Sequence, residues 1–184
     1  QRLAGLLRLL ELERVEVNIF RGASRDIGSP QVYGGPVLGQ ALQAAYATVD
    51  ESRVVHSLHA YFLRRGDFNA PIVYFVDRSR DGQSFTSRRV TAIQHGEQIF
   101  NCSASFQRPE PGFEHQLTMP EVPFPEELPE SLAPGSEYLE GLSPRLRELV
   151  YERPIECRVV PMSATATLAG APRADRLPAM RRLS

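Results

Sequence analysis

The chain has few of the residues that build disulfide frameworks and metal centres. Its 184 residues include two cysteines, Cys102 and Cys157, and four histidines without the paired spacing of metal ligands. Two cysteines in such positions are too few for a disulfide framework or a structural zinc site. We therefore expect a reduced, cytoplasmic protein that holds no metal and no cofactor.

An excess of charge of one sign is also missing. The 21 basic and 22 acidic residues give a formal net charge of −1, which argues against a general binder of nucleic acid or of anionic membranes. Long apolar runs are absent as well. Residues 2–12 have helical periodicity but are interrupted by charges, so we expect a short amphipathic helix and neither a signal peptide nor a membrane span.

The sequence does contain the material for one good core, since 42% of its residues are hydrophobic. The most distinctive stretch is 34–47, where two glycines open directly into a helix. We expect this helix to start between Pro36 and Gly39, because proline suits the first helical turn. Small apolar residues recur on one of its faces: Leu38, Ala41, Leu42, Ala45 and Val49. Such a face predicts close packing against another element.

The Gly34-Gly35 pair is a candidate binding element. Glycines let the backbone approach a ligand closely, and the free amides at a helix N-terminus can face a carbonyl or an anion. The alternative interpretation is a structural turn at the start of a helix.

Strand patterns surround this helix. Alternating residues predict a half-buried strand over 13–20, and four longer strands over 54–65, 72–80, 83–94 and 97–107. Asp81-Gly82 predicts a two-residue hairpin, and His95-Gly96 the next turn. A twisted antiparallel meander can curl around a helix with a small-residue face. The pattern therefore predicts an α+β protein with the hotdog fold, an antiparallel β-sheet wrapped around a central α-helix.

Cys102 shares its strand face with three apolar residues, Phe100, Ala104 and Phe106, so we expect a small core residue and not a nucleophile. We assign 1–107 to the hotdog and the proline-rich stretch 108–136 to a linker, because the prolines exclude long regular elements. Beyond it we expect a helix over 137–151 that is broken or restarted at Pro144, a strand over 154–160, and a tail without periodicity.

Several ordered motifs together resemble one family. They are Gln31-Val32-Tyr33-Gly34-Gly35, Val55-His56-Ser57-Leu58-His59-Ala60-Tyr61-Phe62-Leu63-Arg64-Arg65-Gly66-Asp67, Arg80-Asp81-Gly82-Gln83-Ser84-Phe85, and Gly112-Phe113-Glu114-His115-Gln116. Over most of residues 1–160 the chain resembles the type II acyl-CoA thioesterases, the TesB-like enzymes that carry two hotdogs in one chain. This resemblance implies a hydrolase that converts fatty acyl-CoA to free fatty acid and CoA in fatty-acid metabolism.

The resemblance also implies that the acid, hydroxyl and amide residues that activate water lie in the second hotdog. Residues 153–158 resemble the first strand of that unit, but nothing after Val160 resembles the remainder. We therefore interpret 137–184 as the truncated start of a second hotdog with an irregular tail, and expect weak or lost activity. Because a single hotdog exposes sheet edges, we expect a homodimer or a higher homo-oligomer.

Two other functions are considered beside thioester hydrolysis. One is a non-catalytic hotdog that binds acyl-CoA or a partner. The other is a hydroxyacyl-thioester dehydratase, which needs a histidine and an acid facing one another across an apolar tunnel. The TesB-like motifs count against the dehydratase.

His56 is the candidate catalytic base. The strand pattern places it on the same face as Val54, Leu58, Ala60 and Phe62, near the helix, and an imidazole titrates in the useful range. The alternative is a hydrogen-bonded histidine that lines the sheet.

The candidate substrate-binding residues are Gly34, Gly35, Gln40, Arg88 and Arg89. The two arginines point to opposite faces of one strand, so one of them can meet the phosphates of coenzyme A at the surface; a salt-bridged sheet surface is the alternative. The Gln40 amide can bind a ligand or satisfy a nearby backbone group.

Overall fold

The computed structural model describes residues 2–26, 32, 34–119, 123–128, 139–151, 156, 158 and 160. The chain divides into two compact units, Gln1–Gly112 and Phe113–Ser184. The first unit contains α1 (Arg2–Leu10), β1 (Leu12–Glu16), β2 (Ile19–Gly22), α2 (Gly34–Tyr46), β3 (Val54–Phe62), β4 (Ile72–Asp81), β5 (Phe85–Gln94) and β6 (Glu97–Gln107). The second contains a 3₁₀ turn, η1 (Pro125–Glu127), and α3 (Pro144–Tyr151).

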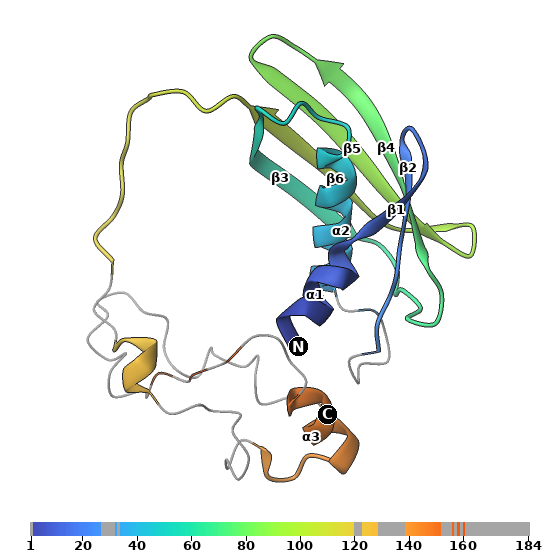
Figure 1. The fold of residues 1–184 in the computed structure, drawn as a ribbon, viewed down its shortest axis with the longest axis vertical. Helices are drawn as coiled ribbons and strands as arrows, with labels where there is room; N and C mark the ends of the chain where they lie inside the picture. The colour runs from blue at the N-terminus through green and yellow to red at the C-terminus, as the bar shows by residue number, and fades with distance from the viewer. Residues whose placement is uncertain are drawn as a thin grey trace. The chain divides into compact units, whose positions relative to one another are not determined.

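The strands of the first unit form one 6-stranded antiparallel sheet in the order β1-β2-β4-β5-β6-β3. Helix α2 lies against one face of this twisted sheet, in contact with β4, β5 and β6 (Figure 1). The predicted hotdog architecture is therefore confirmed. The strand path is less simple than a meander, because β3 precedes β4 in the chain but pairs with the far side of β6.

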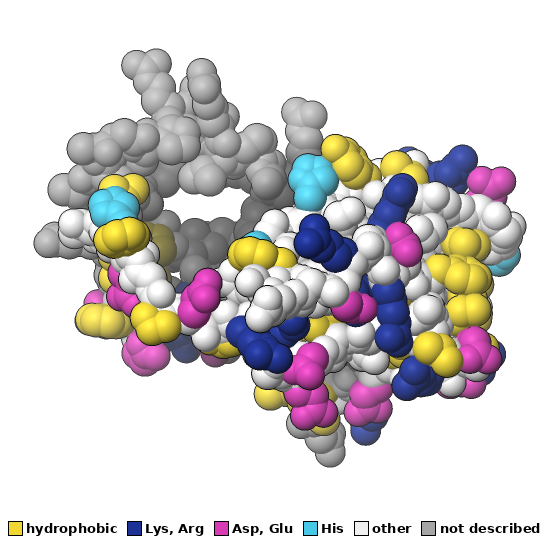
Figure 2. All heavy atoms as spheres, turned by 90° about the horizontal axis from the view of Figure 1, so that it is seen from above, with side chains coloured by type: hydrophobic (Ala, Val, Ile, Leu, Met, Phe, Trp, Pro, Cys, Tyr) yellow, Lys and Arg dark blue, Asp and Glu magenta, His cyan; other side chains and the backbone are white. Residues whose placement is uncertain are grey.

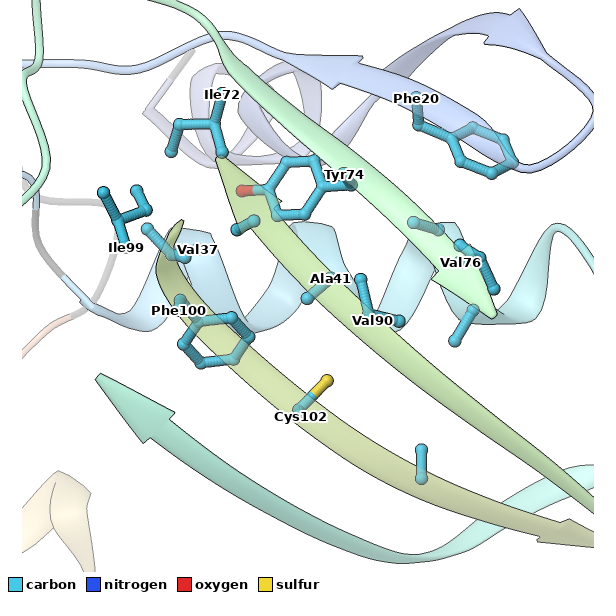
Figure 3. Packing of buried hydrophobic residues seen from close by; sticks show 14 of the residues in the cluster. Phe20, Val37, Ala41, Ile72, Tyr74, Val76, Val90, Ile99, Phe100 and Cys102 are labelled. Atoms are coloured by element: carbon cyan, nitrogen blue, oxygen red, sulfur yellow. The ribbon is translucent and has the colours of Figure 1, made fainter. Parts of the chain in front are cut away.

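The small side chains of α2 let the helix approach the sheet closely. Ala41, Ala44 and Ala45 are 0% exposed, and they pack in one cluster with large side chains of the sheet such as Tyr74 and Phe100 (Figure 3). The predicted small-residue face is thus confirmed in part. The buried face is centred on the alanines and not on the predicted leucines, since Leu38 and Leu42 are only partly buried.

The single strand predicted over 13–20 is wrong. The chain turns at Val17 and Asn18, and β1 and β2 form a hairpin that pairs Leu12 with Gly22. Val15 and Val17 are 56% and 51% exposed, so the alternation that predicted a half-buried strand comes from solvent-facing valines. Valine is enriched in strands in general, so its alternation alone does not mark a buried face.

One of the two predicted tight turns forms. His95 and Gly96 have φ values of 50° and 79°, as the type I′ turn between β5 and β6 requires. Asp81-Gly82 is not a two-residue hairpin, because residues 82–84 form a wider loop between β4 and β5. The guanidinium of Arg53 donates hydrogen bonds to all three carbonyl groups of this loop and holds it open.

Helix α2 begins at Gly34, two residues before the predicted start at Pro36. In the described part of the proline-rich stretch the only regular element is η1, and α3 begins at Pro144 as predicted.

The strand predicted over 154–160 lies outside the described residues except at 156, 158 and 160, and the tail lies entirely outside them. The predicted domain boundaries at 107 and 136 stay predictions. No helix in the described ranges is long and apolar enough to cross a membrane.

Arg88 is a buried cation that joins α2 to the β4–β5 hairpin. Its side chain is 1% exposed. Nε donates a hydrogen bond to Thr48 Oγ1 at 2.8 Å, and Nη2 donates one to the Thr48 carbonyl oxygen at 2.8 Å. Nη2 also lies 2.6 Å from Asp81 Oδ1. Nη1 donates to two carbonyl groups of the hairpin. Thr48 follows the C-terminal end of α2, where the helix dipole favours a positive charge. Arg88 therefore anchors this end of the helix.

Replacing Arg88 should destabilise the fold far more than replacing its neighbour. Arg88→Met leaves buried carbonyl groups without donors, so we expect the free energy of unfolding to fall by about 3 kcal/mol. Arg89→Met makes the same chemical change at an exposed position, and should alter it by no more than about 0.5 kcal/mol. Urea unfolding followed by circular dichroism measures both values. Equal losses would contradict the anchoring role.

Cys102 should be chemically inert in the folded protein. It is 1% exposed, as predicted for a core residue, and burial raises the pKa of its thiol to about 11. Since the thiolate is the reactive form, we expect iodoacetamide at pH 8 to leave Cys102 unmodified until denaturant is added. Peptide mass spectrometry separates this site from Cys157. Rapid labelling of Cys102 without denaturant would show that the strand opens.

Candidate functional site

A cavity of about 450 Å³ opens beside the N-terminus of α2. Its walls come from the first turn of α2, the end of β3 with the residues that follow it, and the start of β6. The lining residues are Val32, Gly34, Val37, Phe62, Leu63, Arg64, Arg65, Gly66, Ile99 and Phe100. This cavity brings together a helix N-terminus, apolar side chains and two cations.

Two aromatic rings form the centre of the apolar wall. The rings of Phe62 and Phe100 lie 4.9 Å apart in a tilted arrangement. Phe100 is fully buried, whereas Phe62 remains 58% exposed. Gly34 lies directly against the Phe62 ring, because a Cβ atom at this position would come within 2.8 Å of it. The missing side chain at Gly34 thus gives the ring its place over the start of α2.

Two arginines flank the apolar wall. Arg64 is 3.2 Å from Glu97 Oε2 and donates to the carbonyl oxygen of Gln98 at 2.7 Å, which orients its guanidinium. Arg65 is exposed, and no residue that the structure describes pairs with its charge. Elsewhere, basic and acidic side chains are interspersed on the face seen in Figure 2. Because Glu97 offsets the charge of Arg64, Arg65 supplies the excess positive charge among the described residues of the cavity.

Gln40 lies in the core and not in this cavity. It is 1% exposed, its Nε2 donates to the carbonyl oxygens of Leu9 and Ala23, and its Oε1 accepts from the Tyr74 hydroxyl at 2.7 Å. Burial raises the pKa of the Tyr74 phenol, which keeps the hydroxyl a donor. The side chain of Gln40 joins the end of α1, the end of β2 and β4. This geometry favours the backbone-satisfying alternative for Gln40.

The strand face predicted for His56 is wrong, because β3 contains a bulge. Val55 pairs with Phe106 and Ser57 with Ser105, so His56 is an extra residue between two pairs. After the bulge the alternation is inverted, and Leu58 packs against the core while His56 is exposed. The imidazole Nε2 lies 2.8 Å from Ser105 Oγ, on the sheet face away from α2.

Arg88 and Arg89 point to opposite faces of β5, as predicted. Arg88 is engaged in the anchor of α2, which favours a structural role for it. Arg89 is exposed on the outer face, opposite Asp77 on β4 and Ser103 on β6. Of the predicted substrate-binding residues, the cavity lining contains Gly34, and Gly35 lies next to it in the first turn of α2.

Sequence reasoning missed the aromatic and cationic parts of the cavity. Phe62, Arg64 and Arg65 stand in one quoted motif, at the point where strand alternation stops and two cations follow. This change of pattern could have predicted that the strand ends here and that charged side chains stand at its end. The contribution of Ile99 and Phe100 depends on the pairing of β3 with β6, and no local pattern reveals it.

Comparisons with known proteins show which proteins the chain is similar to. The profile of the acyl-CoA thioesterase N-terminal domain matches residues 22–107. The chain is 46% identical over 157 residues to acyl-CoA thioesterase 2 of Haemophilus influenzae, covering 85% of this chain and 55% of the relative. The crystal structure of acyl-CoA thioesterase II TesB2 from Mycobacterium marinum matches with a TM-score of 0.69 and 42% identity, covering 90% of this chain and 56% of that one.

The fold has more distant matches as well. A protein of unknown function with a hot dog fold from Alicyclobacillus acidocaldarius gives a TM-score of 0.61 at 23% identity, over 71% of this chain and 50% of that one; this likeness concerns the fold alone. The chain spans about half the length of the relatives it matches. Helix α2, strands β3 to β6 and the cavity all lie inside the range that matches the acyl-CoA thioesterase N-terminal domain, and over this part the chain is similar to the TesB-like acyl-CoA thioesterases.

Proposed function

We propose that this chain is the substrate-binding part of a cytoplasmic acyl-CoA thioesterase, which hydrolyses fatty acyl-CoA to free fatty acid and CoA in fatty-acid metabolism. The observation that carries the proposal is the cavity at α2, in which an apolar wall, a helix N-terminus and a cationic rim lie together. A fatty acyl-CoA carries the matching groups in one molecule: an alkyl chain, a thioester carbonyl and phosphates.

Each part of the cavity has a distinct task in this proposal. The alkyl chain packs against Phe62 and Phe100. The thioester carbonyl faces the first turn of α2, where amide groups without helical acceptors stabilise the negative charge that develops on its oxygen. Gly35 has no side chain that could obstruct this approach, whereas the Phe62 ring occupies the space beside Gly34. Arg64 and Arg65 attract the phosphates.

The water-activating step needs a group from outside this cavity. Hydrolysis requires a base that takes a proton from water as its oxygen attacks the carbonyl carbon, and the departing sulfur takes up a proton as the C–S bond breaks. Among the residues that the structure describes, the lining contains no aspartate, glutamate or histidine. This observation favours a second function for the chain by itself, the binding of acyl-CoA without hydrolysis. It gives no support to a dehydratase, which needs a histidine and an acid.

Binding is the first test. We expect a dodecyl-CoA thioether, which cannot be hydrolysed, to bind the 184-residue chain in isothermal titration calorimetry. Arg65→Ala should weaken binding by up to about fivefold, since an exposed charge pair contributes about 0.2–1 kcal/mol, and added salt should reduce this difference. Arg78→Ala is the matched control, because Arg78 is an exposed arginine of β4 that hydrogen-bonds Asn18 in the β1–β2 turn.

Equal effects of Arg65→Ala and Arg78→Ala would contradict the cationic rim. Arg89→Ala, measured in the same series, tests the sequence-based prediction that this residue meets the phosphates. A loss of affinity in Arg89→Ala alone would move the phosphate site to the outer face of the sheet.

His56 remains the sequence-based candidate for the base, but its hydrogen bond with Ser105 favours a structural role. We therefore expect His56→Ala to hydrolyse dodecanoyl-CoA at the rate of the unmodified chain, as measured by the release of CoA. A general base contributes about 10²–10⁴-fold. A loss of that size, with an unchanged melting temperature, would make His56 the base despite its position on the sheet.

We also propose a homodimer or a higher homo-oligomer. Strand β3 is one edge of the sheet, and its exposed residues include Val54 and Tyr61 at 44% and 58%. An unpaired edge with apolar side chains favours pairing with a second unit. Sedimentation velocity at micromolar concentration should show a species heavier than the 20.6 kDa chain. A single species of monomer mass over the whole range would refute the assembly.

A further inference from the structure

Phe62 combines features that point to a role beyond packing. It is the last residue of β3 and is 58% exposed, although a phenyl ring gains free energy from burial. Its ring nevertheless lies in a defined place, over Gly34 and beside Phe100. The side chain is therefore held on two sides and open to solvent on the others.

Contact with Gly34 makes the ring an exposed wall of the cavity at the helix start. A Cβ atom at Gly34 would meet the Cζ and Cε1 atoms of the ring at 2.8 and 2.9 Å, so the ring rests on bare backbone at the first residue of α2. Rotation about the side-chain bonds of an exposed phenylalanine requires no repacking of the core. The ring of Phe100, by contrast, is 0% exposed and forms the fixed wall.

We propose that Phe62 determines the length of the acyl chain that the cavity accepts. The proposal rests on the proposed function, because it assigns the alkyl chain to the wall formed by Phe62 and Phe100. Methylene groups that pack inside the cavity each add affinity, whereas carbons beyond the Phe62 ring remain in water and add little. The ring thus marks the chain length at which affinity stops rising.

The test measures binding of S-alkyl-CoA thioethers of increasing chain length to the 184-residue chain by calorimetry. For the unmodified chain, affinity should rise by about fourfold per added methylene and then reach a plateau. In Phe62→Ala the plateau should move by about two carbons to longer chains, because the space of the ring becomes available. Phe62→Trp, with its larger side chain, should move the plateau to shorter chains.

Tyr61→Ala is the matched control. Tyr61 precedes Phe62 on the same strand and has the same exposed fraction, 58%, but its ring packs on His59 and not on the cavity wall. In Tyr61→Ala the affinity should reach its plateau at the same alkyl chain length as in the unmodified chain. Phe62→Leu keeps an apolar contact with Phe100 and serves if Phe62→Ala fails to fold.

The outcomes separate the two proposals. If no thioether of any length binds the unmodified chain, the proposed function fails and this inference fails with it. If thioethers bind but the plateau is the same in the Phe62 variants, or shifts equally in Tyr61→Ala, the role of Phe62 is overturned while the proposed function stands.

Discussion

The close approach of α2 to the sheet is the constraint on which the rest of the first unit depends. Three alanines with no exposed surface form the contact, and any larger side chain there would push the helix outward and open the core. The position of the helix along its axis is set at the other end, where Arg88 binds Thr48 and Asp81. With the lateral and axial positions both fixed, the N-terminus of α2 has one place relative to β3 and β6.

Long, strongly patterned elements could be predicted from the sequence. Strand β6 has the bounds predicted for it, and β5 begins two residues later than predicted, because alternation over many residues constrains register. The β1–β2 hairpin was missed, since Val15 and Val17 mimic a buried face while standing in solvent. The wide loop at Asp81-Gly82 was missed because its shape is set by Arg53, a residue distant in sequence.

The candidate site was predicted in outline and not in detail. Gly34 and Gly35 were found because consecutive glycines before a helix are a local signal. Arg88 and Arg89 were correctly placed on opposite faces, but period-2 alternation does not say which face is buried. That choice depends on Thr48, forty residues earlier in the chain. The cavity walls unite residues of three elements, so they became visible only with the strand order.

The bulge at His56 determines which of the side chains that follow it on β3 face the core. If the same sequence paired on from Val55 without a bulge, Tyr61 and not Phe62 would stand opposite Phe100, and a phenol hydroxyl would enter the apolar wall. The strand end would also meet Gly34 with a different side chain. A shift of pairing that removes the bulge while every residue is kept therefore exchanges the two faces of the strand end, and the chemistry of the cavity changes without any substitution among the residues that line it.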